Sequence, residues 1–471
     1  MGKSQRAALT AVLAISCSVG AASEKAVKVT AQAAKEWRVD LDFLLSEMQR
    51  IHPNPFHSVR RADFLAAAQR LSRQIPGLTR DQVIVEFARL IAMIGEGHTQ
   101  LGMSWDERIG FGVYPFRLYL FDDGLFVRAT TPELQEFAGS RIVKIGKLSP
   151  PEAIAAVTPI TQRDNEMTLK DVVPNLLVIP EVLFVLGVCD RSDGCTFVVE
   201  QPGGRRSTVE LHRLGFGARP TWVRANEKSP VPLPLYLRHR DKNFWFEYLS
   251  DSQTLYVQYN AAADSAEETV KAFAERAFRF ADEHPVAKLI MDLRLNNGGD
   301  NTLNAPLVDG IRSRAEIDQP GRLFAIIGRL TFSAAMNCAM DLEKHTRVTF
   351  VGEPTGSRPN QYGDATDIVL PHSGITVRVS TRYWEDGGPS DRRAWIAPAI
   401  SVGLSSDDFR NNRDPVMEKI LALETPTRTS ALELLPIGRR RSSPTALPEE
   451  SRQRDVTEDS DTALGHVAPT D

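Results

Sequence analysis

The chain has 471 residues, of which 42% are hydrophobic and 25% charged, and its formal net charge at pH 7 is −4. A chain of this length has room for about two to four domains and a large hydrophobic core. The composition is ordinary for a soluble globular protein. Basic residues are not in surplus, so the chain lacks the electrostatic footprint of a nucleic-acid-binding protein, and we expect no nucleic-acid partner.

Residues 1–22 predict a signal peptide. MGKSQR is basic, Ala7–Val19 is apolar and rich in small residues, and Gly20-Ala21-Ala22 fits a cleavage site. The apolar run is shorter than the ~20 residues that a membrane-spanning helix needs. We therefore expect an exported protein, periplasmic or secreted, with no transmembrane span in the mature chain. Lipid anchoring at Cys17 is the alternative, although Ala14-Ile15-Ser16 matches a lipoprotein cleavage box poorly.

Residues 30–104 predict an N-terminal helical bundle. One apolar stripe at helical spacing consists of Trp37, Leu41, Leu44, Leu45 and Met48. The two prolines of 52–56 cannot continue this first helix. A second helix is expected over 64–75, closed by Pro76-Gly77, and a third from Asp81 to its stop near Gly95.

A histidine follows this bundle in a glycine-flanked loop, Gly95-Glu96-Gly97-His98-Thr99. A ring presented just past a rigid helix is able to face a cleft, although a solvent-exposed loop histidine is the commoner case. His52 and His57 lie beside prolines, and we interpret them as structural. No HEXXH motif is present, so a zinc peptidase of that type finds no support.

Residues 105–215 predict a β-rich module, and residues 216–243 a connector rich in proline and charge. The expected elements of the module are a hairpin of Tyr114–Phe121 and Leu125–Ala129, a strand over 139–146 and a helix from Pro151. A turn-rich loop separates Cys189 from Cys195. In an oxidising compartment we therefore expect a disulfide between these two cysteines. Cys338 is interpreted as a buried helix residue.

From residue 244 the pattern becomes α/β, and 244–424 is the predicted core. The expected strands are 254–259, 287–293, 324–327 and 348–351, and Ile375–Val379 and Tyr383-Trp384 are expected to continue the same sheet. Helices are expected over 266–283 and from Asp414 to Leu423. Residues 425–471, rich in Pro, Ser, Thr and charge, predict a disordered tail.

Two turns in this core carry candidate chemistry. The strand 287–293 leads to Gly298 and Gly299, and paired glycines there can expose N–H groups to an anion, or form an ordinary tight turn. After the strand 324–327, a short turn delivers Ser333 to the start of a helix. This geometry presents a nucleophilic hydroxyl beside backbone N–H groups; the alternative is a helix N-cap.

Four motifs in order resemble those of the tail-specific, C-terminal-processing and tricorn-type serine peptidases. They are GHT (97–99), LIMDLRLNNGG (289–299), LTFSAAM (330–336) and GEPTG (352–356). The match runs from about Trp37 to Leu423 and is strongest over 254–400. The resemblance implies an α/β fold with a crotonase-like ββα core. In the family this core is often joined by a PDZ-like peptide-binding module, and residues 105–215 lie where such a module would be.

The resemblance also implies a site. Ser333 would be the nucleophile and His98 its general base, and the oxyanion hole would consist of backbone N–H groups of Gly298, Gly299 and Ala334. The expected substrate is a peptide or an unfolded protein, and neither a metal nor a cofactor is implied.

The chain departs from the family at three positions. The Ser/Lys branch has its lysine in the loop after GEPTG, where residues 356–361 contain none, and Arg358 cannot act as a base. The histidine-using tricorn-type branch, which the chain resembles more closely, has a serine where this chain has Gly97. Its orienting glutamate corresponds to the stretch 390–398, where Asp391 is the nearest carboxylate.

Several questions stay open from sequence. Glu385 and Asp386 are alternatives to Asp391, and each of the three is otherwise a solvated surface charge. A non-catalytic ligand- or peptide-binding protein on the same fold is an alternative function, because the retinoid-binding interphotoreceptor protein resembles this family. A hydrolase of non-peptide esters or amides would use the same residues. The cleavage preference and oligomeric state do not follow from the sequence.

Overall fold

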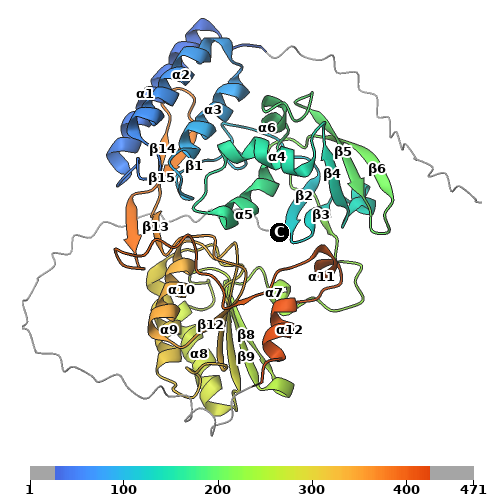
Figure 1. The fold of residues 1–471 in the computed structure, drawn as a ribbon, viewed down its shortest axis with the longest axis vertical. Coiled ribbons are helices and arrows are strands. Elements are labelled where there is room, and N and C mark those ends of the chain that lie inside the picture. The colour runs from blue at the N-terminus through green and yellow to red at the C-terminus, as the bar shows by residue number, and fades with distance from the viewer. Residues whose placement is uncertain (1–26, 425–471) are drawn as a thin grey trace, which may run out of the picture. The chain divides into compact units, whose positions relative to one another are not determined.

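The computed structural model describes residues 27–424, which form a mixed α/β fold with several sheets (Figure 1). The predicted signal peptide, 1–22, and the predicted tail, 425–471, lie outside the described residues. Within the described range, no helix combines the length and the apolar character required to cross a bilayer.

The three helices predicted at the N-terminus are confirmed. They are α1 (Ala31–Ile51), α2 (Arg61–Gln74) and α3 (Arg80–Ala92). Thr30 caps α1 by accepting the Ala33 N–H, and Thr79 forms a reciprocal capping box with Gln82 on α3. The chain then leaves α3 through Gly95, whose φ of 78° lies in the left-handed region that favours glycine.

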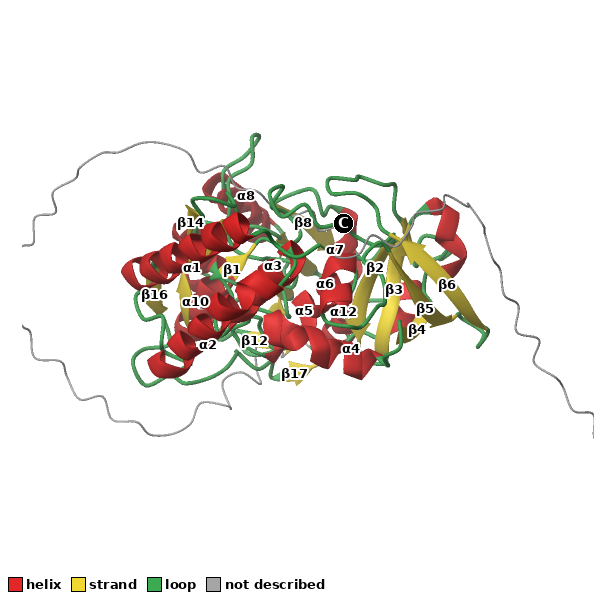
Figure 2. Ribbon diagram, turned by 90° about the horizontal axis from the view of Figure 1, so that it is seen from above, coloured by secondary structure: helices red, strands yellow, loops and turns green. Residues whose placement is uncertain are grey.

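The region after the bundle contains the predicted hairpin, within a larger antiparallel sheet. Its strands lie in the order β2 (Phe116–Phe121), β3 (Gly124–Thr130), β4 (Arg141–Ile145), β5 (Gly194–Glu200) and β6 (Arg206–His212), with β7 (Val223–Arg224) pairing with β3. The region is more helical than predicted, with α4 (Pro150–Val157), α5 (Glu166–Leu176) and α6 (Pro180–Val185). Figure 2 shows these helices beside the sheet. Apolar side chains of this region and of α1–α3 form one continuous core.

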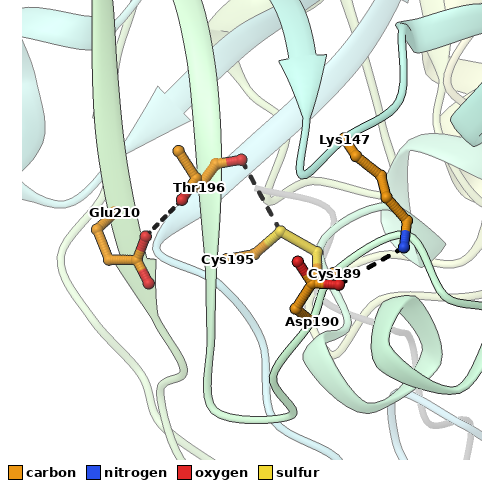
Figure 3. The surroundings of a disulfide bond; sticks show 6 residues. All are labelled: Lys147, Cys189, Asp190, Cys195, Thr196 and Glu210. Carbon is orange, nitrogen blue, oxygen red and sulfur yellow. Dashed lines mark hydrogen bonds and ion pairs between the residues drawn. A yellow bond between two sulfur atoms is a disulfide. The ribbon is translucent and has the colours of Figure 1, made fainter.

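The predicted disulfide between Cys189 and Cys195 is present (Figure 3). It joins the segment after α6 to the start of β5, and both cysteines are buried. On its surface side the Asp190 carboxylate pairs with the Lys147 ammonium at 3.5 Å. The bond therefore closes the loop that the sequence identified as turn-rich.

The core region contains a six-stranded sheet. Its strands lie in the order β17 (Ile400–Ser401), β12 (Thr349–Gly352), β11 (Leu323–Ile327), β10 (Lys288–Asp292), β9 (Thr254–Tyr259) and β8 (Phe244–Leu249). All pairs are parallel except β8 with β9. Every residue of β10 and β11 is buried, as the apolar runs predicted.

Helices cover both faces of this sheet. One face packs against α8 (Val270–Glu283), α9 (Ala305–Arg312) and α10 (Ala334–His345). The other face packs against α7 (Leu235–Arg238) and α12 (Pro415–Leu421), and the short α11 (Ser406–Arg410) precedes α12. Because the strands are parallel, their C-terminal turns meet at one edge, where the Gly298 and Ser333 turns lie close together.

The prediction that residues 375–379 and 383–384 continue the central sheet is wrong. The strands β13 (Asn360–Gly363) and β16 (Arg382–Glu385) form a separate two-stranded sheet, and β1 (Gln100–Leu101), β15 (Thr376–Val379) and β14 (Thr366–Val369) form a three-stranded one. The buried side of β15 packs into the N-terminal core instead. In Figure 1 the orange strands β14 and β15 accordingly lie beside the blue helices.

The β14–β15 hairpin also positions the loop that contains His98. Gln100, two residues after His98, pairs with Arg378 of β15. The buried Asp40 of α1 fixes the β14–β15 hairpin, because its carboxylate accepts the N–H groups of His372 and Ser373 at 2.8 Å each. The hairpin thus carries the chain from the core back to the bundle and holds the loop that follows α3.

Candidate active site

The two candidate catalytic side chains are in contact. His98 Nε2 lies 2.9 Å from Ser333 Oγ, although the two residues are 235 positions apart in the chain. This is the distance expected for a nucleophile hydrogen-bonded to its base. Other groups around this pair come from loops before α5 and after β12.

Ser333 occupies a strained turn between β11 and α10. Its φ of 53° and ψ of −125° are unusual for a residue with a side chain, and such conformations cluster at functional sites. The Thr331 hydroxyl braces the turn: its oxygen accepts the Gly328 N–H, and the hydroxyl donates to the Leu293 carbonyl, each at 3.0 Å. Ser333 makes no side-chain capping bond to α10, so the N-cap alternative finds no support.

The loop after β12 holds the main chain of Ser333. The Ser333 N–H donates to the Ser357 hydroxyl at 3.1 Å, and Gln361 Nε2 donates to the Ser333 carbonyl at 3.1 Å. In this lysine-free loop, Arg358 Nε donates to the Asp164 carbonyl at 2.7 Å. Arg358 therefore connects the loop after β12 to the loop before α5, which is a structural role.

The His98 ring is packed so that only one of its nitrogens, Nε2, has a side-chain partner. Phe332 stacks on it, with ring centroids 4.5 Å apart, and no side chain bonds Nδ1, beside which the Tyr362 backbone lies. A Cβ on Gly97 would lie 2.7 Å from Phe332 Cζ, so a serine at that position would require the Phe332 ring to shift. Burial lowers the pKa of His98 and the charge of Glu96 raises it, with a net lowering, so the ring is neutral and able to accept a proton near pH 7.

The prediction for Asp391 is not supported by its position. Its carboxylate accepts hydrogen bonds from the backbone and side chain of Arg393, the closest side-chain contact being 2.8 Å, and none of its contacts is with His98. The alternatives are also elsewhere: Asp386 accepts from the Asn337 amide, and Glu385 is exposed on β16. An arginine two residues away provides a nearer partner than the imidazole does.

The predicted oxyanion groups lie around Ser333, but they are not equivalent. The Gly298 N–H already donates to Asn296 Oδ1 at 2.9 Å. The N–H groups of Gly299 and Ala334 have no hydrogen-bond acceptor among the described residues, and both residues line the cleft next to Ser333. Gly298 instead allows close approach, since a Cβ there would lie 2.6 Å from Ser333 Cβ.

We expect Gly298→Ala to lower the rate of Ser333 modification at least ~100-fold and the free energy of unfolding by ~1–3 kcal/mol. The reason is the combination of its φ of 113° with the clash against Ser333. Labelling by a fluorophosphonate and thermal melting measure the two effects. The matched control is Gly203→Ala, because Gly203 has a φ of 100° and open space around it. Equal labelling of both variants would contradict the assigned role.

A cleft of about 330 Å³ opens beside Ser333. Its walls come from the turn before α9, from α10, from β13 and the residue after it, and from β16, and they include Asp300, Asn301, Thr302, Asn337, Gln361, Asp364, Arg382 and Trp384. The Arg382 guanidinium lies 3.7 Å over the Trp384 ring and 3.8 Å from the Asp364 carboxylate. In the described part of the chain, no group of three His, Cys, Asp or Glu side chains is arranged to hold a metal ion.

Two buried carboxylates near His98 were missed from sequence, Glu96 and Asp164. Asp164, in the loop before α5, accepts the Gly97 N–H at 2.8 Å. Burial and the charge of Glu96 raise the pKa of Asp164 to about 7, although the Gly97 N–H, Arg358 and the Ser357 hydroxyl oppose this. Asp164 thus lies between the histidine loop and the loop that supports Ser333. Nothing in its local sequence indicates this position.

We expect Asp164→Asn to make stability less dependent on pH. Because the pKa of Asp164 is about 7 in the folded state and near 4 when unfolded, the unfolded state releases this proton first, and the wild type loses stability as pH rises from 4 to 7. Relative to that of the wild type, the free energy of unfolding of the variant should therefore be ~2 kcal/mol higher at pH 8 than at pH 5, as measured by urea unfolding. The exposed Asp190→Asn is the control. An equal difference at both pH values would refute this.

No family model and no curated protein matches the sequence. Solved structures do match. Mature CPAF complexed with lactacystin aligns at a TM-score of 0.61 and 11% identity, over 83% of this chain and 97% of that one. Mature CPAF alone aligns at 0.58 and 12%, over 83% and 96%. The photosystem II D1 C-terminal processing protease aligns at 0.40 and 16%, over 80% and 94%. The chain therefore shares its fold with CPAF.

Proposed function

We propose that this protein is an exported serine peptidase in which Ser333 is the nucleophile and His98 the general base. The observation that carries the proposal is the 2.9 Å contact between a serine in a strained strand-to-helix turn and a half-buried, neutral histidine, beside an open cleft. The fold shared with CPAF supports it. On this proposal the six-stranded sheet and its helices are the crotonase-like core, and residues 105–215 correspond to the PDZ-like module.

The proposed reaction runs through an acyl-enzyme. As Ser333 Oγ bonds to the scissile carbonyl carbon, its proton passes to His98 Nε2, and the carbonyl oxygen becomes an oxyanion near the N–H groups of Gly299 and Ala334. His98 then gives the proton to the amine, which leaves as the C–N bond breaks. Water enters, loses a proton to His98 and attacks the ester. The carboxylic product leaves as the proton returns to Ser333.

The test is reaction of the mature protein with a fluorophosphonate probe, combined with hydrolysis of unfolded protein and of a mixed peptide library followed by mass spectrometry. We expect one label on Ser333 and cleavage that the label abolishes. Cleavage of aryl esters without any cleavage of peptides would favour a non-peptide hydrolase. Absence of both labelling and hydrolysis would overturn the proposal and favour the binding-protein alternative.

A further inference from the structure

The site leaves one charge without a side-chain partner. When His98 takes the Ser333 proton it becomes an imidazolium, but no side chain accepts a hydrogen bond from its Nδ1: the Tyr362 backbone is the acceptor beside the ring, which is packed under Phe332. A buried cation needs a nearby opposite charge. Asp391, which the family resemblance suggested for this role, is occupied by Arg393.

Glu96 is the buried carboxylate nearest in sequence to His98, and both of its oxygens accept hydrogen bonds. Its Oε2 accepts the His98 N–H, and its Oε1 accepts the Thr99 N–H at 2.7 Å and the Ser380 hydroxyl at 2.9 Å. The residue is only 3% exposed. These bonds fix the backbone on both sides of the His98 Cα and tie the loop to the residue that follows β15.

We propose, on the basis of the proposed function, that Glu96 is the positioning residue of this site: it orients the His98 loop and supplies the negative charge that stabilises the His98 imidazolium. It acts from beside the histidine backbone and does not touch the substrate or the reacting atoms. It thereby takes the place of a carboxylate bonded to Nδ1.

The charges around the pair support this assignment. Burial would raise the pKa of Glu96, but His52, the charge and backbone N–H of His98, and the Thr99 hydroxyl lower it to about 2, so Glu96 is ionised at neutral pH. His52 Nε2 lies 3.7 Å from Glu96 Oε1. On the His98 ring, Glu96 has the largest favourable charge effect.

The other groups that face the ring come from neighbouring strands. Asp364 and the Tyr362 backbone, from β13 and the residue after it, raise the pKa of His98, whereas Arg378 of β15 lowers it. The carboxylate of Asp164 accepts the Gly97 N–H of the same loop and interacts with the charge of Glu96. Glu96 is therefore the group whose removal should move the His98 titration most.

The test is Glu96→Gln in the mature full-length protein, read by two methods. The first is the NMR titration of ¹³C-labelled histidine rings, with the His98 signal identified from its loss in His98→Ala. The second is the pH profile of kcat/KM. Because the anion favours the protonated ring, we expect the variant to lower the His98 pKa by about 1 unit or more and to move the acid limb of kcat/KM to lower pH by the same amount. We also expect kcat to fall ~10–100-fold.

The matched control is Glu181→Gln. Glu181 is likewise 3% exposed and accepts a backbone N–H, that of Gly112, but it lies in α6 and pairs with Arg213. The control should leave the His98 titration and the acid limb unchanged. An unchanged His98 pKa in Glu96→Gln, even with lower kcat, would reduce Glu96 to a structural residue and overturn the proposal.

A measurement on the wild type keeps the test valid if Glu96→Gln does not fold. The side-chain carboxyl carbon of ¹³C-labelled Glu96 should shift with the midpoint of the His98 titration, and absence of that shift would also overturn the proposal. Both NMR readouts are independent of turnover. If the wild type hydrolyses nothing, the proposed function fails, while the Glu96–His98 coupling is still measured.

Discussion

Replacing Ser333 with alanine is expected to lower kcat/KM for peptide hydrolysis by at least ~10⁴-fold while leaving stability unchanged. The catalytic loss follows from removal of the only hydroxyl bonded to His98 Nε2 among the described residues. Stability should not fall because the Ser333 side chain caps nothing in α10, and its positive φ is no easier for serine than for alanine. Steady-state kinetics and thermal melting test both halves.

The control for this prediction is Ser405→Ala. Ser405 is a true N-cap: its hydroxyl accepts the Asp408 N–H at 3.0 Å and is part of a capping box at the start of α11. Its loss should cost ~1 kcal/mol of unfolding free energy and leave kcat/KM unchanged. The two serines thus separate the nucleophile from the N-cap interpretation. A stability loss without a rate loss in Ser333→Ala would restore the N-cap interpretation.

Elements were predictable where the local pattern alone determines the structure. The apolar runs of β10 and β11 predict buried strands, and a strand, a short turn and a small-residue helix predict that Ser333 lies on the turn between them with its hydroxyl accessible. The position of 375–379 was not predictable in this way. Its alternation predicts a strand, but the choice of partner depends on β1 and on the N-terminal core, which lie far away in sequence.

The same reasoning applies to the site. Family position suggested Asp391, but the nearby Arg393 competes for its carboxylate, and this Asp-x-Arg spacing was an available signal. Glu96 stands in the glycine-flanked loop 95–99, outside the GHT motif, and a carboxylate between two glycines next to a candidate base is a sequence signal for a positioning role. Its burial depends on Ser380, which is 284 positions away, so its role required the structure.

Replacing His98 with alanine is expected to lower kcat by ~10⁴-fold and to abolish the acid limb of the pH profile, because no other base contacts Ser333 in the described structure. Residual activity should then rise steadily with hydroxide concentration. The control is His284→Ala, an exposed histidine stacked on Phe280 at 3.8 Å, which should keep wild-type kinetics.

The same variant makes a signed prediction for stability. The pKa of His98 is lower in the folded state than in the unfolded chain, so the unfolded state takes up this proton first as pH falls below about 6.5. The contribution of His98 to the free energy of unfolding of the wild type is therefore fully present above that pH and is lost below it. The difference in unfolding free energy between wild type and His98→Ala should be smaller at pH 5 than at pH 8. A difference that grows on acidification would mean that His98 is charged in the resting protein, and a resting imidazolium cannot accept the Ser333 proton.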